Sequence, residues 1–235
     1  MTRRPTELDA WFPLDDDEHA RQLAGLADLA LPPDADAPPT RVVDLGCGSG
    51  RTAAPLAEGG ASVLALDRDP AALDALPDHP RLIPRRADFL APHADLAHPD
   101  GPARAALCLG HTLMHLHQPI HALELLRRLA PVLEPAAPLA IDAFPLALWR
   151  EVADGYWQEG VSEDGSMQLL WEQGDNVLVL RTAAAVDPDS WSPAPHEPRL
   201  RLWSLGELEL LARAAGWTGP ETRPDSHLIL LRSPG

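Results

Sequence analysis

Residues 41–50 read RVVDLGCGSG, an apolar run that ends in an acid and is followed by alternating glycines. Glycine is needed where the backbone adopts φ > 0 or where a ligand lies directly against the main chain. The segment therefore predicts a strand, a tight loop and the start of a helix, with a ligand resting on the loop. An ordinary glycine-rich turn is the alternative, and residues elsewhere in the chain must separate the two.

The acid before the loop indicates which charge the ligand carries. Asp44 stands at the end of the expected strand, where its carboxylate can receive a cationic ammonium group. A phosphate at the same position would be repelled. The loop therefore favours a cationic ligand.

Length and charge limit the class of protein. With 235 residues and 45% hydrophobic content, the chain can form one sizeable globular core. Its 19 basic residues, all arginine, are outnumbered by 35 acidic ones, which gives a net charge of −16. Such a chain repels phosphate backbones and anionic lipids, so we expect no nucleic acid and no membrane partner. The charge favours a small-molecule partner and leaves the oligomeric state open.

The cysteines and the N-terminus carry no sign of export. Cys47 and Cys108 are the only cysteines, and they predict neither a disulfide framework nor a zinc cluster. The N-terminal residues lead to no apolar signal-peptide segment, and no run approaches the ~18 apolar residues of a membrane helix. We therefore expect a cytoplasmic protein.

From residue 41 onward, expected strands and helices alternate, which is typical of a parallel sheet with helices on both faces. Strands are expected at 41–45, 62–66, 81–86, 105–109 and 138–141, and helices at 51–58, 70–76 and 119–131. A helix at 205–215 and two further strands, the last at 227–231, complete the pattern. The predicted fold class is α/β, a Rossmann-like, mostly parallel seven-stranded sheet with an antiparallel β insertion after the fifth strand.

Changes in composition divide the chain into four segments. Residues 1–40 form an N-terminal helical region, either packed on the domain or acting as a lid, and residues 41–150 form the cofactor-binding core. Turn signals between apolar runs predict an antiparallel β insertion over residues 151–203, which would cap the substrate. Residues 204–235 return to the core as its last helix and closing strands.

Acidic residues follow three consecutive strands of the predicted sheet, where ligands of open α/β sheets bind. Asp67 follows the glycine loop by about 20 residues, the spacing of an acid that accepts both hydroxyls of a ribose. Asp88 can accept from the exocyclic amine of adenine, and Phe89 or Arg68 can cover a face of the base. With an ammonium at Asp44, these groups together point to S-adenosylmethionine.

One set of motifs joins these observations: VVDLGCGSG at 42–50, LDRD at 66–69, ADF at 87–89 and GH at 110–111. Together they resemble the class I S-adenosylmethionine-dependent methyltransferases of the small-molecule type, over residues 41–150 and 200–232. The resemblance implies that S-adenosylhomocysteine is the product and that the insertion contributes to substrate binding. It also implies cofactor contacts: the methionine part at Gly46, Cys47, Gly48 and Gly110, the ribose at Asp67 and the adenine at Asp88.

Two other functions compete with methyl transfer. A nicotinamide-dependent oxidoreductase would carry G-x-G-x-x-G, but Arg51 stands where the third glycine belongs, and Asp44 precedes the loop. A non-catalytic protein that binds S-adenosylmethionine is the other alternative, because a ligand site does not prove turnover.

A histidine-rich segment follows the fourth strand and supplies the candidate catalytic residues. His111 stands at the strand end, near the expected methyl group, and His115 lies one turn later on the same side if the segment is helical. Either can serve as a general base, or can shape the cofactor site without proton transfer. His117 and His121 would lie on another face of that helix, so we expect no metal site.

The methyl acceptor is the least determined part of the reaction. No Asn/Asp-Pro-Pro-aromatic motif follows the fourth strand, which argues against methylation of bases or glutamine amides and favours an O or N nucleophile of a small molecule. The aromatic residues of the insertion can line an apolar pocket, or they can form the core of the insertion, and the sequence favours neither alternative. The candidate substrate contacts are Trp11, Asp142, Tyr156, Trp157 and Trp171.

Overall fold

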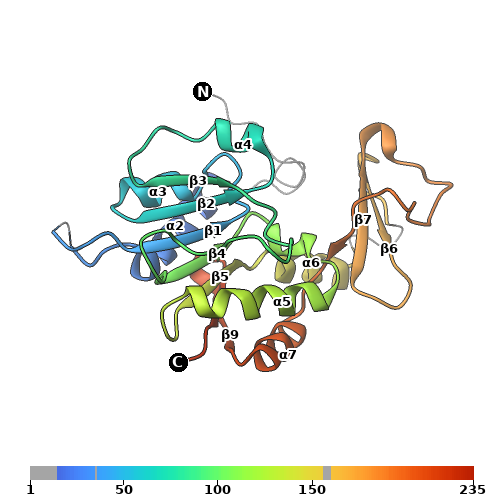
Figure 1. Ribbon diagram of the computed structural model, residues 1–235. Helices are drawn as coiled ribbons and strands as arrows, with labels where there is room; N and C mark the ends of the chain where they lie inside the picture. The colour runs from blue at the N-terminus through green and yellow to red at the C-terminus, as the bar shows by residue number, and fades with distance from the viewer. Residues whose placement is uncertain (1–14, 35, 156–159) are drawn as a thin grey trace.

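A computed structural model describes residues 15–34, 36–155 and 160–235 of the chain (Figure 1). Trp11, Tyr156 and Trp157, which we expected to contact the substrate, lie outside the described residues. None of the helices in the described part of the chain is both long and apolar enough to cross a membrane.

The main sheet of the described residues has seven strands in the order β3-β2-β1-β4-β5-β10-β9. The first five pair in parallel, whereas β10 runs antiparallel to both β5 and β9. This topology confirms the predicted fold class. The strands are β1 (Arg41–Leu45), β2 (Ser62–Asp67), β3 (Leu82–Arg86), β4 (Ala105–Cys108), β5 (Pro138–Asp142), β9 (Thr218–Arg223) and β10 (Leu228–Arg232).

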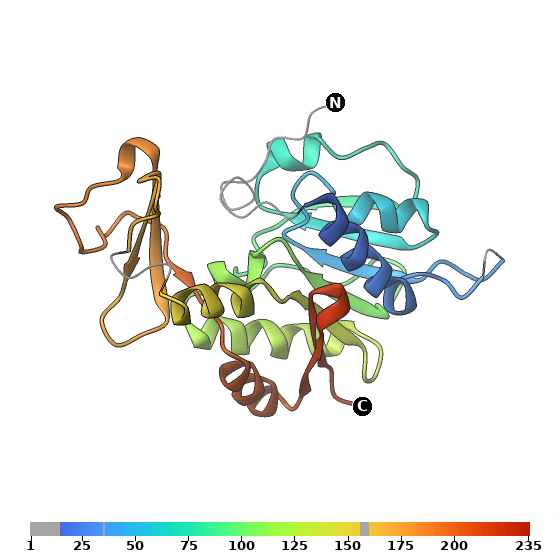
Figure 2. The same cartoon turned by 180° about the vertical axis from the view of Figure 1, so that it is seen from behind.

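Helices cover both faces of this sheet. Successive residues of a strand point to opposite faces, so Val43 joins an apolar layer with α5 and α7, and Val42 joins a layer with α2 and α3. The two views show α5 and α2 on opposite sides of the sheet (Figure 1, Figure 2). The helices are α2 (Asp16–Ala30), α3 (Ala53–Glu58), α4 (Pro70–Asp74), α5 (Pro119–Leu129), α6 (Phe144–Ala153) and α7 (Leu205–Ala215).

The N-terminal helix α2 packs on the core. Asp15 accepts from the backbone N–H of Glu18, whose side chain accepts from the N–H of Asp15 in return. This capping box fixes where the helix begins. Leu26 and Leu29 then bury their side chains in the layer beneath β1.

Two helical segments differ from the sequence expectation. Helix α6 was not predicted and crosses the expected boundary at residue 150; a proline in its first turn, where the missing N–H costs nothing, is compatible with a start there. The histidine-rich segment forms a single 3₁₀ turn, η1 (Thr112–His115), and not an α-helix. His111 precedes it in the left-handed conformation, with φ 62°.

The insertion forms its own antiparallel sheet, made within the described residues by β6 (Met167–Trp171), β7 (Val177–Thr182) and β8 (Leu200–Arg201). The expected hairpin is β6–β7, and β8 adds a third strand to it. Its apolar face packs on Met114 of η1 and Leu148 of α6. We call this sheet with its loops the cap; it stands beside the main sheet at the right of Figure 1.

Candidate functional site

A cavity of about 320 Å³ opens at the carboxyl ends of β1 to β4. Every residue that the sequence assigned to the cofactor lines this cavity, and so does His115. The lining consists of Asp44, Gly46, Cys47, Gly48, Arg51, Thr52, Asp67, Arg68, Asp69, Ala87, Asp88, Phe89, Leu90, Leu109, Gly110, Thr112, His115, Pro198 and Leu200.

The glycine loop leaves room for a ligand against its backbone. Gly46 and Gly48 both have positive φ, 71° and 54°. A Cβ at Gly46 would lie 2.6 Å from the Thr112 side chain, whereas one at Gly48 would meet no atom within 4 Å. Gly46 is therefore needed for packing between the loop and η1, and Gly48 faces open space where a ligand can approach the main chain.

The carboxylate of Asp67 ties this loop to the end of β2. One oxygen accepts from the backbone N–H of Gly48 at 2.8 Å, and the other from the N–H of Asp69 at 2.9 Å. The acid is therefore held at the cavity wall by two backbone donors.

Asp44 is a buried carboxyl group at the bottom of the cavity. Burial raises its pKa from 3.8 to about 7; the positive charge of Arg51 lowers it, and the negative charge of Asp67 raises it. A cation placed beside Asp44 would favour the ionised form. Burial, with Asp44 and Asp67 nearby, also raises the pKa of the Cys47 thiol well above its usual value, so this thiol stays neutral.

Arg51 lines the cavity, although the sequence analysis used it only as a departure from the nicotinamide motif. Its Nη2 donates to Oε1 of Gln22 at 3.3 Å, and Gln22 is a buried residue of α2. The N-terminal helix thus supports a cation next to the glycine loop. Its position directly after Gly50, the last glycine of the loop, was the signal that could have identified it as a site residue.

Asp88 and Phe89 form the end of the cavity beneath β3, at the edge of the sheet. Oδ1 of Asp88 accepts from the N–H of Leu90 at 2.9 Å, which shapes a tight turn. Nη1 of Arg128 on α5 donates to the carbonyl of Phe89 at 2.8 Å. The loop after β3 is therefore held in place by both a local and a distant contact.

His111 and Asp142 form a buried pair behind the cavity wall. Both side chains are almost fully buried, and neither is among the described residues that line the cavity. The expectation that His111 and His115 share a side does not hold in this respect, because only His115 reaches the cavity. A contact of Asp142 with substrate stays a prediction.

His115, the last residue of η1, is among the residues that line the cavity. Partial desolvation beside the cavity lowers its pKa, and the positive charges of Arg68 and His111 lower it further, although the residue remains exposed to solvent. The imidazole is therefore neutral near pH 7 and able to accept a proton.

The cap reaches the cavity through Pro198 and Leu200, neither of which the sequence marked as a site residue. Trp171 does not line the cavity in the described structure; its ring stacks on Trp149 of α6, with centroids 6.4 Å apart. Its role in substrate binding also stays a prediction.

The same segment of the cap holds η1 in position. The buried guanidinium of Arg201 donates from Nε to the carbonyl of His117 at 2.6 Å. The indole N–H of Trp203 donates to the carbonyl of Leu113 at 3.0 Å. The turn that carries His115 is thus attached to the cap through two backbone carbonyls.

Comparisons with known proteins agree with this geometry. A family model described as a methyltransferase domain matches residues 42–136, which include the glycine loop, Asp67, Asp88 and η1. No curated protein matches the chain.

Solved structures of methyltransferases share the fold over nearly the whole chain. The CcbJ methyltransferase from Streptomyces caelestis is 17% identical, with 93% of this chain and 96% of that chain covered and a TM-score of 0.57. The sugar N-methyltransferase KedS8 from Streptoalloteichus is 14% identical, with 100% and 96% covered and a TM-score of 0.59.

A third structure was solved with ligands. It is the 1,6-didemethyltoxoflavin-N1-methyltransferase of Burkholderia thailandensis, bound to 1,6-didemethyltoxoflavin and S-adenosylhomocysteine. It is 18% identical, with 97% of this chain and 82% of that chain covered and a TM-score of 0.54. At these identities the structures establish only the fold. The family model matches the part of the sequence that holds every cavity residue except Pro198 and Leu200. Residues 42–136 thus match a methyltransferase domain, and the chain shares its fold with solved methyltransferases, one of them bound to S-adenosylhomocysteine.

Proposed function

We propose that the chain is a class I S-adenosylmethionine-dependent methyltransferase. It methylates an oxygen or nitrogen nucleophile of a small molecule, and His115 is the general base. The observation that carries the proposal is the position of His115 in the lining of a cavity that the cap residues Pro198 and Leu200 also line. The lowered pKa of His115 favours the neutral imidazole that a base requires. A base is useful where the nucleophile carries a proton, as a hydroxyl or an ammonium group does.

The residues present fit S-adenosylmethionine. Asp44 is a buried acid with a raised pKa, and a cationic amino group placed beside it would restore its charge. Arg51, on the same side of the loop, suits the carboxylate of the methionine part. The open space at Gly48 admits the ligand chain close to the backbone, with Gly46, Cys47 and Gly110 around it.

The nucleoside end fits the other strand ends. We assign Asp67 to the ribose hydroxyls and Asp88 to the adenine amine, with Phe89 and Arg68 against the faces of the base. These residues follow β2 and β3 and line the cavity there. The methionine part then lies toward β4, which places the sulfur near His115.

When bound, the cofactor supplies an electrophilic methyl group on a sulfonium. The protein has to align the nucleophile with that methyl group and exclude water. His115 accepts the proton of the nucleophile, and its lowered pKa keeps it unprotonated at neutral pH. His111, which Asp142 holds, contributes to the lowered pKa of His115, and we assign it a supporting role.

A small acceptor is supported by the size and charge of the site. The cavity is bordered on one side by the cap segment, and its volume of about 320 Å³ is that of a small-molecule site. Two of the similar structures are a sugar N-methyltransferase and a 1,6-didemethyltoxoflavin-N1-methyltransferase, and the acceptors in their names are small molecules. Trp11, Tyr156, Trp157 and Trp171 remain proposed acceptor contacts, the first three outside the described residues.

Transfer of a labelled methyl group to a panel of small amines, phenols and sugars tests the proposal. We expect at least one compound to accept label, and His115→Ala to lower the turnover number by about 10²-fold or more. The affinity for S-adenosylhomocysteine, measured by calorimetry, should stay nearly the same. If only this affinity fell and turnover at saturating cofactor did not, His115 would be a binding residue and the base assignment would be wrong.

A further inference from the structure

The cavity has two ends, because the sheet order places β3 at one edge and β4 toward the centre. Asp67, Asp88 and Phe89 lie at the end beneath β2 and β3. His115 lies at the β4 end, and the cap residues Pro198 and Leu200 meet the cavity there, because β8 packs against η1. The cap therefore borders the part of the cavity that is left for the acceptor.

We propose that Pro198 and Leu200 form the wall that limits the size of the acceptor, and that Arg181 and Glu197 are the positioning residues that hold this wall. This inference rests on the proposed function, since it assumes that the methyl group lies toward η1. It assigns the acceptor to molecules that present a compact apolar flank to the wall and a proton-bearing nucleophile to His115.

Leu200 is fixed by the apolar face of the cap. It is almost fully buried and belongs to one cluster with Met114 of η1, Leu148 of α6 and Leu178 of β7. Leu178 is also its partner in the β7–β8 pairing. Leu200 can therefore move toward or away from the cavity only if the cap sheet moves with it.

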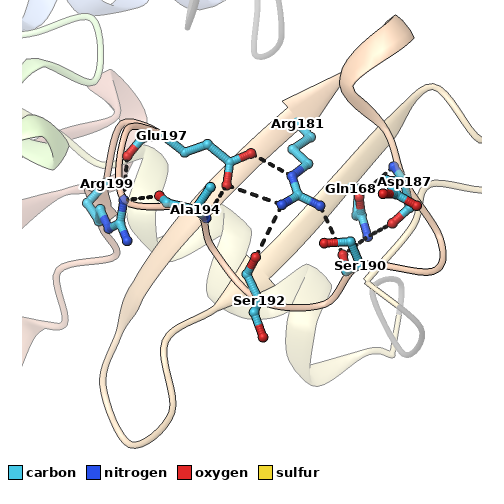
Figure 3. A network of polar contacts seen from close by, with 8 residues as sticks. All are labelled: Gln168, Arg181, Asp187, Ser190, Ser192, Ala194, Glu197 and Arg199. Carbon is cyan, nitrogen blue, oxygen red and sulfur yellow. Dashed lines mark hydrogen bonds and ion pairs between the residues drawn. The ribbon is translucent and has the colours of Figure 1, made fainter.

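Pro198 is exposed and belongs to no strand, so other contacts must fix it. The segment from Asp187 to Arg199 has no regular secondary structure and crosses the polar face of the β6–β7 hairpin (Figure 3). Gln168 and Arg181 face each other in the hairpin register and both point to this segment. Gln168 donates to the carbonyls of Asp187 and Ser190 at 2.9 and 3.1 Å.

Arg181 is the centre of this network (Figure 3). Its Nη1 donates to the carbonyl of Ser190 at 2.9 Å, and its Nη2 to that of Ser192 at 3.2 Å. Its guanidinium also binds both oxygens of Glu197, at 2.6 and 3.2 Å, and the Arg181 side chain is only 8% exposed. A bidentate, mostly buried pair of this kind fixes orientation as well as distance.

The neighbours of Pro198 are held on both sides. Glu197 is bound by Arg181 of β7, and its Oε2 also accepts from the N–H of Ala194 at 2.6 Å. Arg199 donates to Glu172, just after β6, at 3.0 Å and to the carbonyl of Glu197 at 2.7 Å. Because both flanking residues are attached to the hairpin, the proline between them has little freedom to yield to a larger ligand.

Stable analogues of the cofactor allow a test that needs no knowledge of the acceptor. In these probes an amine replaces the sulfonium and carries either a methyl or a benzyl group. The benzyl group projects into the space that the wall would limit. Calorimetry on the full chain gives the affinity for each probe, and the readout is the ratio of the methyl to the benzyl affinity.

We expect the wild-type protein to favour the methyl probe, and Pro198→Gly and Leu200→Ala to lower the ratio by about tenfold. Arg181→Ala and Glu197→Ala should lower it as well. Glu197→Gln keeps one oxygen as an acceptor but turns an amide NH2 toward the donors at the other position, so it should lower the ratio less than Glu197→Ala does. Arg213→Ala removes an exposed arginine that pairs with Glu209 on α7 and serves as the matched control. A general loss of stability would weaken both probes alike and leave the ratio unchanged.

Each failure has a separate meaning. A wild-type ratio near one, unchanged in Pro198→Gly and Leu200→Ala, would overturn the wall. A ratio that falls in those two variants but not in Arg181→Ala or Glu197→Ala would overturn the role of the positioning pair. If the wild-type protein bound S-adenosylhomocysteine but showed no methyl transfer to any class of acceptor, the proposed function would fail while the wall could still be measured.

Discussion

The carboxylate of Asp142 holds His111 from two directions. Its Oδ2 accepts the backbone N–H of His111 at 2.9 Å, and its Oδ1 lies 3.4 Å from the ring nitrogen Nδ1. The contact joins the end of β5 to the residue that begins the turn into η1. His111 adopts positive φ there, a conformation that residues other than glycine rarely occupy without a local partner.

Removal of the Asp142 carboxylate should therefore destabilise the turn. For Asp142→Ala we expect a loss of about 1–3 kcal/mol in the free energy of unfolding, because a buried backbone donor loses its acceptor. Asp142→Asn keeps an oxygen for this N–H and should lose clearly less. Urea denaturation of the three proteins checks this, and equal losses in both variants would show that the N–H contact contributes little.

Gly46 and Gly48 should separate packing from ligand binding. Alanine at either position must adopt positive φ, which costs about 1–2 kcal/mol. At Gly46 the new Cβ also overlaps the Thr112 side chain, so Gly46→Ala should lose stability well beyond this amount. Gly48→Ala has open space around its Cβ and should fold nearly normally, but it fills the space that we assign to the cofactor.

Thermal melts and titration with S-adenosylhomocysteine distinguish these two effects. We expect Gly48→Ala to melt above Gly46→Ala and to bind the ligand more weakly than the wild type by about tenfold or more. Normal affinity in Gly48→Ala would place the ligand away from this part of the loop.

The core of the fold was predictable because its signals are local. Short apolar runs that end in Asp44 and Asp67 mark strand ends, and glycines mark the loop, so the sequence alone indicates both the sheet and one wall of the cavity. The acids and glycines assigned from these signals all line the cavity in the structure. Their contacts with a cofactor remain predictions.

The two histidines show where local reasoning stops. On an α-helix, residues four apart lie on one side, whereas in a 3₁₀ turn with three residues per turn they diverge by about 120°. The sequence does not show which form the segment takes, because Arg201 and Trp203 fix η1 from almost ninety positions away. Pro198 and Leu200 were missed for a related reason: β8 is too short to show a pattern, and its place at the cavity depends on how the cap packs.

Asp44 should make the stability of the free protein fall as pH rises. Its pKa is about 7 in the folded state and 3.8 ordinarily, so the folded state binds the proton more tightly than the unfolded state. Between pH 3.8 and pH 7 the unfolded chain has released the proton, whereas the folded protein keeps it. The free energy of unfolding therefore falls as pH rises, by up to about 4 kcal/mol above pH 7. Asp44→Asn cannot titrate and lacks this contribution.

Denaturation of the wild type and of Asp44→Asn at pH 5 and pH 8 measures the effect. The difference in unfolding free energy between the two proteins should shift by about 2–3 kcal/mol in favour of the variant at the higher pH. Groups that titrate equally in both proteins cancel in this comparison. A difference that stays constant with pH would mean that Asp44 is ionised throughout, with an ordinary pKa.

The same carboxyl group should couple cofactor binding to proton release. The ammonium of the methionine part favours ionised Asp44, so binding at pH 6 must expel the proton that the free protein carries there. Affinity for S-adenosylhomocysteine should therefore rise with pH, by up to about tenfold per pH unit below pH 7. Calorimetry at pH 6 in two buffers with different ionisation enthalpies counts the protons released, and we expect a value approaching one per site.

Asp44→Asn should bind S-adenosylhomocysteine more weakly and release no proton. Equal proton release in both proteins would assign the linkage to another group and place the ammonium away from Asp44.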